Sequence, residues 1–244
     1  MSHIEEPPAR AFHGATVPTP PIPDDDGGAS PELRRELDQL ARGRGSGPAV
    51  LTALSAARLF VPVVAVLETE SIDADGLRHE NQSSMATVLI DSPEHGRALL
   101  AFSCLESLSR WRPDARPVPT AAPLAARAAV GESADAMVVD VAGPIPFALQ
   151  GDELLLMAAV ARPTDTAEPD PVIERAVARV LGALGYEGAA HEVRSMGADR
   201  PASLEIHGIR SDVARAAIVD RLSREQVVNR LLPQGLRVNF FDTP

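Results

Sequence analysis

The sequence contains no lysine and a single cysteine, Cys104, in 244 residues. All 23 basic residues are therefore arginines. Without lysine, the chain cannot form a Walker-type phosphate loop or a Schiff base with a substrate. A lone cysteine excludes an internal disulfide, a CxxC motif and a thiolate-rich zinc site. These absences remove several classes of enzyme before any fold is considered.

Aromatic residues, long apolar runs and excess positive charge are also scarce. Aromatic residues make up 3% of the chain, so the core must consist mainly of Leu, Val, Ile and Ala. The longest apolar run, Leu59 to Leu67, is too short to cross a bilayer, and the first twenty residues lack the apolar core of a signal peptide. A formal net charge of −11 opposes binding to nucleic acid and to anionic lipid. We expect a cytoplasmic protein that binds neither.

Changes in composition divide the chain into four segments. Residues 1–29, rich in proline and aspartate, cannot bury enough apolar surface to fold and are predicted to be a disordered tail. Residues 30–161 contain alternating helix and strand patterns and form the predicted larger domain. The polar segment 162–170 is the predicted linker, and residues 171–244 form a predicted small C-terminal domain.

The larger domain has the pattern of a layered α/β protein. Ser30-Pro31 is typical of a helix start, and that helix should end before the glycine-rich turn at 43–48. Residues 85–90 and 97–102 predict a hairpin with both faces covered, because both of its alternating sets of side chains are apolar. Pro62, in a strand over 59–67, is expected near the strand start or at a sheet edge. Helices are predicted over 50–57, 121–130 and 152–160, and strands over 116–119 and 136–141.

Two capping boxes predict helix starts. Ser103-Cys104-Leu105-Glu106 places Ser103 at the cap of a helix that runs to Trp111, and residues 223–226 predict a second such start. The C-terminal domain reads as an α-β-β-α-β unit, with a helix after Asp170-Pro171 and a last strand over 236–241. The buried stripe of its first helix is predicted to comprise Ile173, Val177, Val180, Leu181 and Leu184. The fold class is thus mixed α/β: a layered sheet with a hairpin and flanking helices, plus this smaller unit.

A set of short sequence motifs between residues 49 and 160 resembles a known family. They are Leu54 with Ala57-Arg58-Leu59 and Val61-Pro62-Val63; Ser84-Met85-Ala86; Gly96-Arg97-Ala98-Leu99; Ala101-Phe102-Ser103; Leu108 with Arg110-Trp111; Ala115-Arg116-Pro117-Val118-Pro119; and Asp140 with Ala142-Gly143-Pro144. As a set they resemble the SseB family, the "enhanced serine sensitivity" proteins, and more closely its actinobacterial branch. The family has no agreed reaction, cofactor or catalytic residue. The resemblance therefore implies a fold and a cytoplasmic protein that acts through protein contacts.

The only tryptophan, Trp111, lies between Arg110 and Arg112, and Arg116 follows four residues later. Arg110, Trp111, Arg112 and Arg116 thus form one group in the sequence. Arginine and tryptophan are enriched at the energetic centres of protein interfaces, so this segment is the candidate contact for a partner. In the alternative interpretation, Trp111 anchors its helix on the sheet and the arginines are merely solvated. Both interpretations are open at this point.

A second candidate is a small-ligand site at Arg116 and Asp140. Asp140 follows a predicted strand and precedes the turn at Gly143-Pro144, and ligands of open α/β sheets bind outside the carboxyl ends of strands. An aspartate in this position is also a common turn or cap residue.

Cys104 is the third candidate, as a nucleophile assisted by His13, His79, His95, His191 or His207. A helix N-terminus makes a thiol more reactive, although a free cysteine is also commonly a small buried residue. The histidines show no metal-ligand spacing, and we predict neither metal nor cofactor.

We therefore predict a non-enzymatic protein that binds a protein partner, whose identity, like the oligomeric state, is left open. The alternatives are a regulatory module for a small anionic metabolite such as an amino acid, and a Cys104-dependent enzyme.

Overall fold

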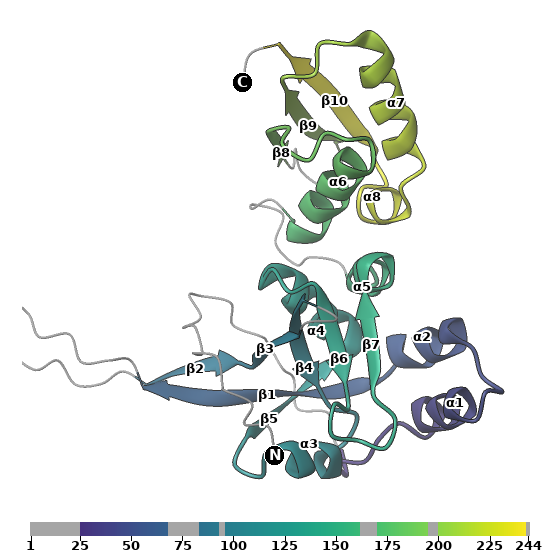
Figure 1. Ribbon diagram of the computed structural model, residues 1–244, viewed down its shortest axis with the longest axis vertical. Helices are drawn as coiled ribbons and strands as arrows, with labels where there is room; N and C mark the ends of the chain where they lie inside the picture. Colours follow the sequence, from purple (N-terminus) through teal and green to yellow (C-terminus); the bar gives the residue numbers. More distant parts are fainter. Residues whose placement is uncertain (1–24, 68–82, 93–95, 162–169, 195–199, 243–244) are drawn as a thin grey trace, which may run out of the picture. The chain divides into compact units, whose positions relative to one another are not determined.

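The computed structural model describes residues 25–67, 83–92, 96–161, 170–194 and 200–242 (Figure 1). The predicted tail up to residue 24 and the predicted linker up to residue 169 lie outside these ranges. The chain divides into two compact units, Met1–Ala125 with Ser133–Gly151, and Ala126–Glu132 with Asp152–Pro244. Both contain helices and strands, so the mixed α/β class is confirmed.

Two helices precede the first strand. α1 (Pro31–Ala41) begins at Pro31, as predicted, and buries Leu33 and Leu37. α2 (Gly47–Ser55) begins inside the predicted glycine-rich turn. The Ser46 side chain accepts a hydrogen bond from the Ala49 N–H (3.4 Å), and this cap starts the helix earlier than the apolar pattern indicated.

The first sheet has the order β2-β1-β5, and β1 (Arg58–Leu67) lies in its middle. β2 (Ser83–Thr87) and β5 (Arg116–Ala121) both pair with it in the antiparallel sense. The expectation that Pro62 lies near a strand start or an edge is therefore wrong. Pro62 is the fifth residue of a central strand.

The prolines of this sheet sit where the ladder between β1 and β5 needs no donor. Pro62 faces Pro117, and Phe60 faces Pro119. Phe60 exchanges its backbone hydrogen bonds with Phe102 on its other side (2.7 and 2.8 Å), so these are the non-hydrogen-bonded pairs of the β1–β5 ladder. The nitrogens of Pro117 and Pro119 consequently point to the outer side of β5.

Pro62 also sets the point at which the chain passes from the first sheet to the second. Val88 donates its N–H to the Pro62 carbonyl (3.3 Å), but Pro62 has no N–H to return. The Val88 carbonyl instead accepts the Leu100 N–H (3.3 Å). The single strand predicted over 85–90 is therefore split into β2 and β3 (Leu89–Ser92), which belong to different sheets.

The second sheet has the order β3-β4-β6-β7. β4 (Gly96–Ala101) and β6 (Ala136–Val139) are parallel, and the other pairs are antiparallel. The predicted hairpin is confirmed as β3–β4, and residues 98–101 of β4 are all buried, as expected for a strand covered on both faces. The short β7 (Phe147–Gln150) was not predicted. The connection from β4 to β6 comprises α3 (Leu105–Trp111), β5 and α4 (Ala122–Gly131).

The second unit contains the predicted α-β-β-α-β order, with the predicted restart as a short helix before the last strand and one further helix ahead of the first. Besides the part of α4 from Ala126 onward, its elements are α5 (Gly151–Ala158), α6 (Pro171–Ala183), β8 (His191–Arg194), β9 (Ala202–His207), α7 (Asp212–Ser223), α8 (Gln226–Leu231) and β10 (Leu236–Phe241). β9 lies between β10, which is parallel to it, and the antiparallel β8. In the described ranges of the chain, no helix combines the length and apolarity needed to span a bilayer.

The predicted stripe of α6 forms the core of this unit. Ile173, Val177, Val180 and Leu181 are buried against β8, β9 and α7, and Leu184 is partly buried there. The second predicted capping box is wrong. Ser223 donates its hydroxyl to the Asp220 carbonyl, and Glu225, at the cap of α8, binds Arg179 (3.1 Å) instead of the backbone.

Asp170 provides the first prediction. One carboxylate oxygen accepts the Val172 N–H at the start of α6 (2.9 Å) and also the Arg127 guanidinium (2.9 Å), and the side chain is only 7% exposed. Asp170→Ala should lower the free energy of unfolding by about 3 kcal/mol, because both the cap and a mostly buried ion pair are lost. Asp170→Ser keeps a cap acceptor and should retain about 1 kcal/mol of that stability. Urea unfolding measures both; equal losses would contradict a contribution from the cap.

Candidate functional site

The candidate contact residues lie on α3 and at the start of β5. We call Arg110, Trp111, Arg112 and Arg116 the Trp111 surface. Arg110 is exposed and pairs with Glu106 one turn earlier. The Arg112 guanidinium lies 5.2 Å from the centre of the Trp111 ring, within the range of a cation–π interaction. Arg116 is exposed at the first position of β5.

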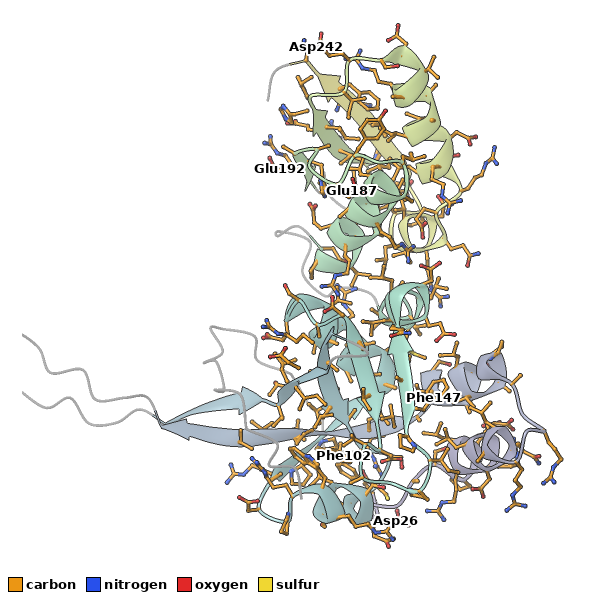
Figure 2. The ribbon with its side chains drawn as sticks, viewed as in Figure 1. Asp26, Phe102, Phe147, Glu187, Glu192 and Asp242 are labelled. Atoms are coloured by element: carbon orange, nitrogen blue, oxygen red, sulfur yellow. The ribbon has the colours of Figure 1, made fainter. Side chains whose placement is uncertain are left out.

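Trp111 is at the same time a structural anchor. Its ring centre lies 5.4 Å from that of Phe102, which is labelled in Figure 2. It also packs against the cluster that contains Phe60 and Leu108. Ala115, between Arg112 and Arg116, is buried in this cluster too. One side of the indole therefore holds α3 on the sheet, and the Arg112 guanidinium stacks on the ring. The interpretation of Trp111 as an anchor and its interpretation as part of a contact are compatible.

A buried polar pair joins the ends of the two parallel strands. Asp140 follows β6 and Ser103 follows β4, so their side chains meet at the carboxyl edge of the sheet. One Asp140 oxygen accepts the Ser103 N–H (2.9 Å) and the other accepts its hydroxyl (2.5 Å). Asp140 is only 5% exposed, and its φ of 57° lies in the left-handed region. Both carboxylate oxygens are thus used to hold two strands together.

The turn after Asp140 fits closely around this pair. The Gly143 N–H donates to the Asp140 carbonyl (2.8 Å), and a Cβ on Gly143 would lie 2.8 Å from the Asp140 Cβ. Only glycine avoids that clash without a shift of the backbone. The sequence interpretation of Asp140 as a turn or cap residue therefore describes its contacts better than the interpretation as a ligand.

The first predicted capping box is wrong, because Ser103 and Asp140 bind each other. Ser103 does not cap α3, because its hydroxyl is bound by Asp140. The cap is Cys104, whose sulfur accepts the Ser107 N–H (3.4 Å). Glu106 points to Arg110 and not back to the cap. The helix itself runs to Trp111, as predicted.

Arg58 is the residue of this region that the sequence interpretation missed. Its guanidinium donates to the Ser103 carbonyl (3.1 Å), to Asp25 (2.5 Å) and to the Gly28 carbonyl (2.7 Å), and it stacks on Phe60 at 3.9 Å. Because the partners are 30 or more positions away in the chain, no local pattern revealed them. The one signal available in the sequence was that Arg58 belongs to Ala57-Arg58-Leu59, one of the motifs on which the family resemblance rests.

Residues 25–28 are fixed to α3 as well as to Arg58. The Gly27 carbonyl accepts the Leu105 N–H (2.9 Å) at the start of the helix. Gly27 has φ 77°, and a Cβ there would lie 2.5 Å from the Leu105 side chain. These last residues of the predicted tail therefore belong to the first unit and complete the helix start.

Among the described residues, Arg116 and Asp140 are not joined, and the pairings proposed for Cys104 stay predictions. Arg116 is the first residue of β5 in the first sheet, whereas Asp140 follows β6 of the second sheet, and no hydrogen bond or ion pair between described residues joins them. Among the histidines proposed to assist Cys104, His191 and His207 belong to the second unit, and His13, His79 and His95 lie outside the described residues. Within the described part of the chain, no group of three His, Cys, Asp or Glu side chains could hold a metal ion.

Shifted pKa values occur in the second unit. The hydrogen bond from Arg194 lowers the pKa of the exposed Glu192 carboxyl and raises that of Arg194 itself. Burial raises the pKa of Glu132. Glu192 and Arg194 face solvent on β8 and make a surface ion pair, which indicates no reaction.

Comparison with known proteins gave one family. Residues 33–155 match the family model described as the SseB protein N-terminal domain, which spans half of the chain and contains both the Trp111 surface and the pair of Ser103 and Asp140. No curated protein and no solved structure matched the chain.

The Ser103–Asp140 pair leads to the second prediction. Asp140→Ala should lower the free energy of unfolding by about 3 kcal/mol, because two buried donors lose their acceptor. Ser103→Ala should lower it by about 1 kcal/mol, since the backbone hydrogen bond remains. The double variant should lose less than the sum, as expected for residues that share an interaction. Strictly additive losses in chemical denaturation would contradict the pairing.

Proposed function

The chain belongs to the SseB family, and on that basis we propose that it is a non-enzymatic cytoplasmic protein that acts by binding a protein partner. The Trp111 surface is the proposed contact. The closer resemblance to the actinobacterial branch remains part of this proposal.

The observation that carries the proposal is the use of the buried carboxylate. In α/β proteins a polar group at the carboxyl edge of parallel strands is the usual position for chemistry. Here both oxygens of Asp140 bind Ser103. The neighbouring Arg58 is likewise bound to Asp25 and to backbone carbonyls. The polar groups best placed for a reaction therefore contribute to stability.

The Trp111 surface has the features of an interface centre. The indole is held in place by Phe102, so binding would not have to order it. The guanidinium of Arg112 is stacked on it, and Arg110 and Arg116 are exposed nearby in the chain. A rigid aromatic group with adjacent arginines is the combination that contributes most energy at protein interfaces. The metabolite alternative has less support, because Asp140 offers no unoccupied oxygen.

The third prediction tests the proposed contact. Arg112→Gln with Arg116→Gln should reduce recovery of the specific partner at least five-fold in affinity purification from the native host, because two cationic contacts are removed while Trp111 keeps its packing on Phe102. The matched control is Arg221→Gln with Arg230→Gln, which makes the same change in net charge on exposed helices of the second unit. Equal recovery by both folded variants would refute the Trp111 surface as the contact.

The fourth prediction separates binding from a Cys104-dependent enzyme. Serine is a better helix cap than cysteine, so Cys104→Ser should preserve the hydrogen bond from Ser107 and leave the free energy of unfolding within about 0.5 kcal/mol of the original. Partner recovery should also be unchanged. If Cys104→Ser kept its stability and its partner but failed to replace the original protein in the native host, the Cys104-dependent enzyme would be favoured.

A further inference from the structure

A shallow hollow of about 370 Å³ lies beside α1. We call it the α1 hollow. It is lined by Pro31, Arg34, Arg35, Asp38, Gln39, Arg42 and Arg44. Four of these residues carry a positive charge and one a negative charge. On a chain with a formal net charge of −11, this is a locally cationic surface.

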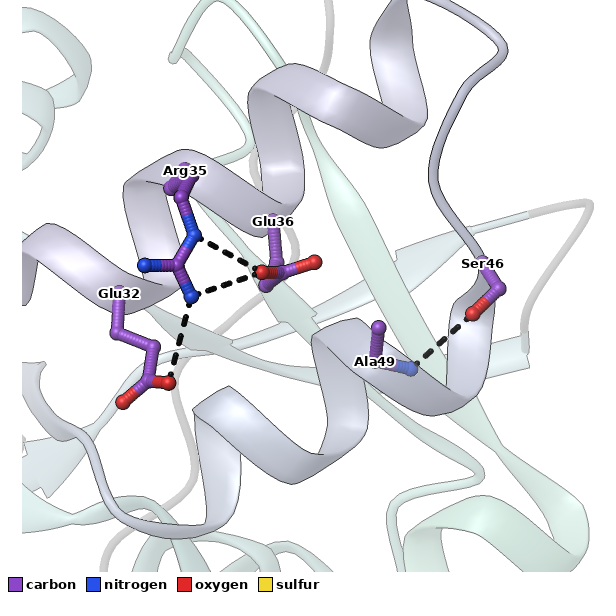
Figure 3. A network of polar contacts seen from close by, with 5 residues as sticks. All are labelled: Glu32, Arg35, Glu36, Ser46 and Ala49. Atoms are coloured by element: carbon purple, nitrogen blue, oxygen red, sulfur yellow. Dashed lines mark hydrogen bonds and ion pairs between the residues drawn. The ribbon is translucent and has the colours of Figure 1, made fainter.

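Two of the arginines are available to a ligand. Arg35 is engaged by Glu32 and Glu36 (3.4 and 3.0 Å; Figure 3), and Arg44 donates to the Gln39 side chain (3.3 Å). Arg34 and Arg42 are exposed, and neither makes an ion pair or side-chain hydrogen bond with another described residue. The hollow thus presents two arginines without a carboxylate partner in the described structure.

The shape of the hollow indicates the class of ligand. All of its described lining residues come from α1 and the turn that follows it, so a single element forms its wall. A small-molecule site buries most of its ligand between several walls. A ligand of the α1 hollow must therefore bring its own second wall, as a segment of another protein does.

The charges repeat along the helix. Arg34, Asp38 and Arg42 follow one another at intervals of four residues, which gives an alternating pattern of positive, negative and positive charge with steps of about 6 Å. Alternate side chains of an extended segment share one face and are about 7 Å apart. An extended segment with acidic, basic and acidic residues at alternate positions would match all three charges.

We propose that the α1 hollow is a docking site for an extended protein segment of this alternating pattern, whose two carboxylates pair with Arg34 and Arg42 and whose central cation pairs with Asp38. Arginine suits the role because its planar guanidinium binds a carboxylate through two hydrogen bonds. The inference rests on the proposed protein-binding function and adds a second contact on a different element. A longer anionic polymer such as nucleic acid is disfavoured by the net charge of the chain.

The fifth prediction uses a synthetic peptide, acetyl-Gly-Glu-Gly-Arg-Gly-Glu-Gly-amide, and a scrambled peptide of the same composition with its two glutamates adjacent. Binding to the full chain is measured at low salt from the chemical shifts of the arginine Nε–Hε groups. The patterned peptide should bind at least three-fold more tightly than the scrambled one and should shift the signals of Arg34 and Arg42.

Matched variants make the test specific. Arg34→Gln with Arg42→Gln should abolish the preference for the patterned peptide, and α1 should stay folded because glutamine and arginine have similar helix propensities. Arg221→Gln with Arg230→Gln should keep it. The inference would be overturned if the two peptides bound equally or if neither bound at millimolar concentration. It would also be overturned if both double variants lost the preference equally, or if inorganic pyrophosphate alone produced the same shifts.

The result is independent of the test of the Trp111 surface. Arg112→Gln with Arg116→Gln should leave peptide binding to the α1 hollow unchanged. If this variant recovers the partner as well as its control does while peptide binding to the α1 hollow is intact, the proposed contact at the Trp111 surface fails and the α1 hollow stands. If its partner recovery falls as predicted but the α1 hollow shows no preference for the patterned peptide, the α1 hollow fails and the proposed contact stands.

Discussion

The guanidinium of Arg58 joins three segments that are far apart in the sequence. It binds Asp25 before α1 and the carbonyl of Ser103 after β4, from its own place at the start of β1. Ser103 in turn binds Asp140 at the end of β6. Buried polar groups must find partners inside the protein, and here each satisfies the next. The parallel strands, the start of α3 and the segment before α1 are therefore placed by one connected set of hydrogen bonds.

The elements whose signal is local could be predicted from the sequence. The stripe of α6, the last strand and the hairpin of β3 and β4 agree with the patterns that predicted them, because hydrophobic periodicity is set by neighbours in the chain. The failures have distant causes. Ser103 does not cap α3, because a carboxylate 37 residues away binds its hydroxyl. The strand predicted over 85–90 is split into β2 and β3, because Pro62, on another strand, cannot return a hydrogen bond.

The residues of the candidate site, too, could be predicted where their signal is local and not where their partners are distant in the chain. The grouping of arginines around Trp111 was visible in the sequence, and the half-buried indole explains why two interpretations of it competed. Arg58 could not be found, since its partners are distant. The charged residues of α1 are a third case, visible in the sequence but without a meaning there. Their spacing of four residues was visible from the start, but only the hollow showed that Arg34, Asp38 and Arg42 line one surface and that Arg35 is already neutralised by Glu32 and Glu36.

The prolines of β5 restrict how another molecule can approach this protein. An exposed strand normally offers its backbone as a template for β-augmentation, the addition of a foreign strand. Pro117 and Pro119 remove two successive donors from the outer side of β5, so a foreign strand aligned there would lack hydrogen bonds at both positions. Recognition beside Arg116 must therefore depend on side-chain chemistry, and self-association into continuous sheets is blocked along the same line.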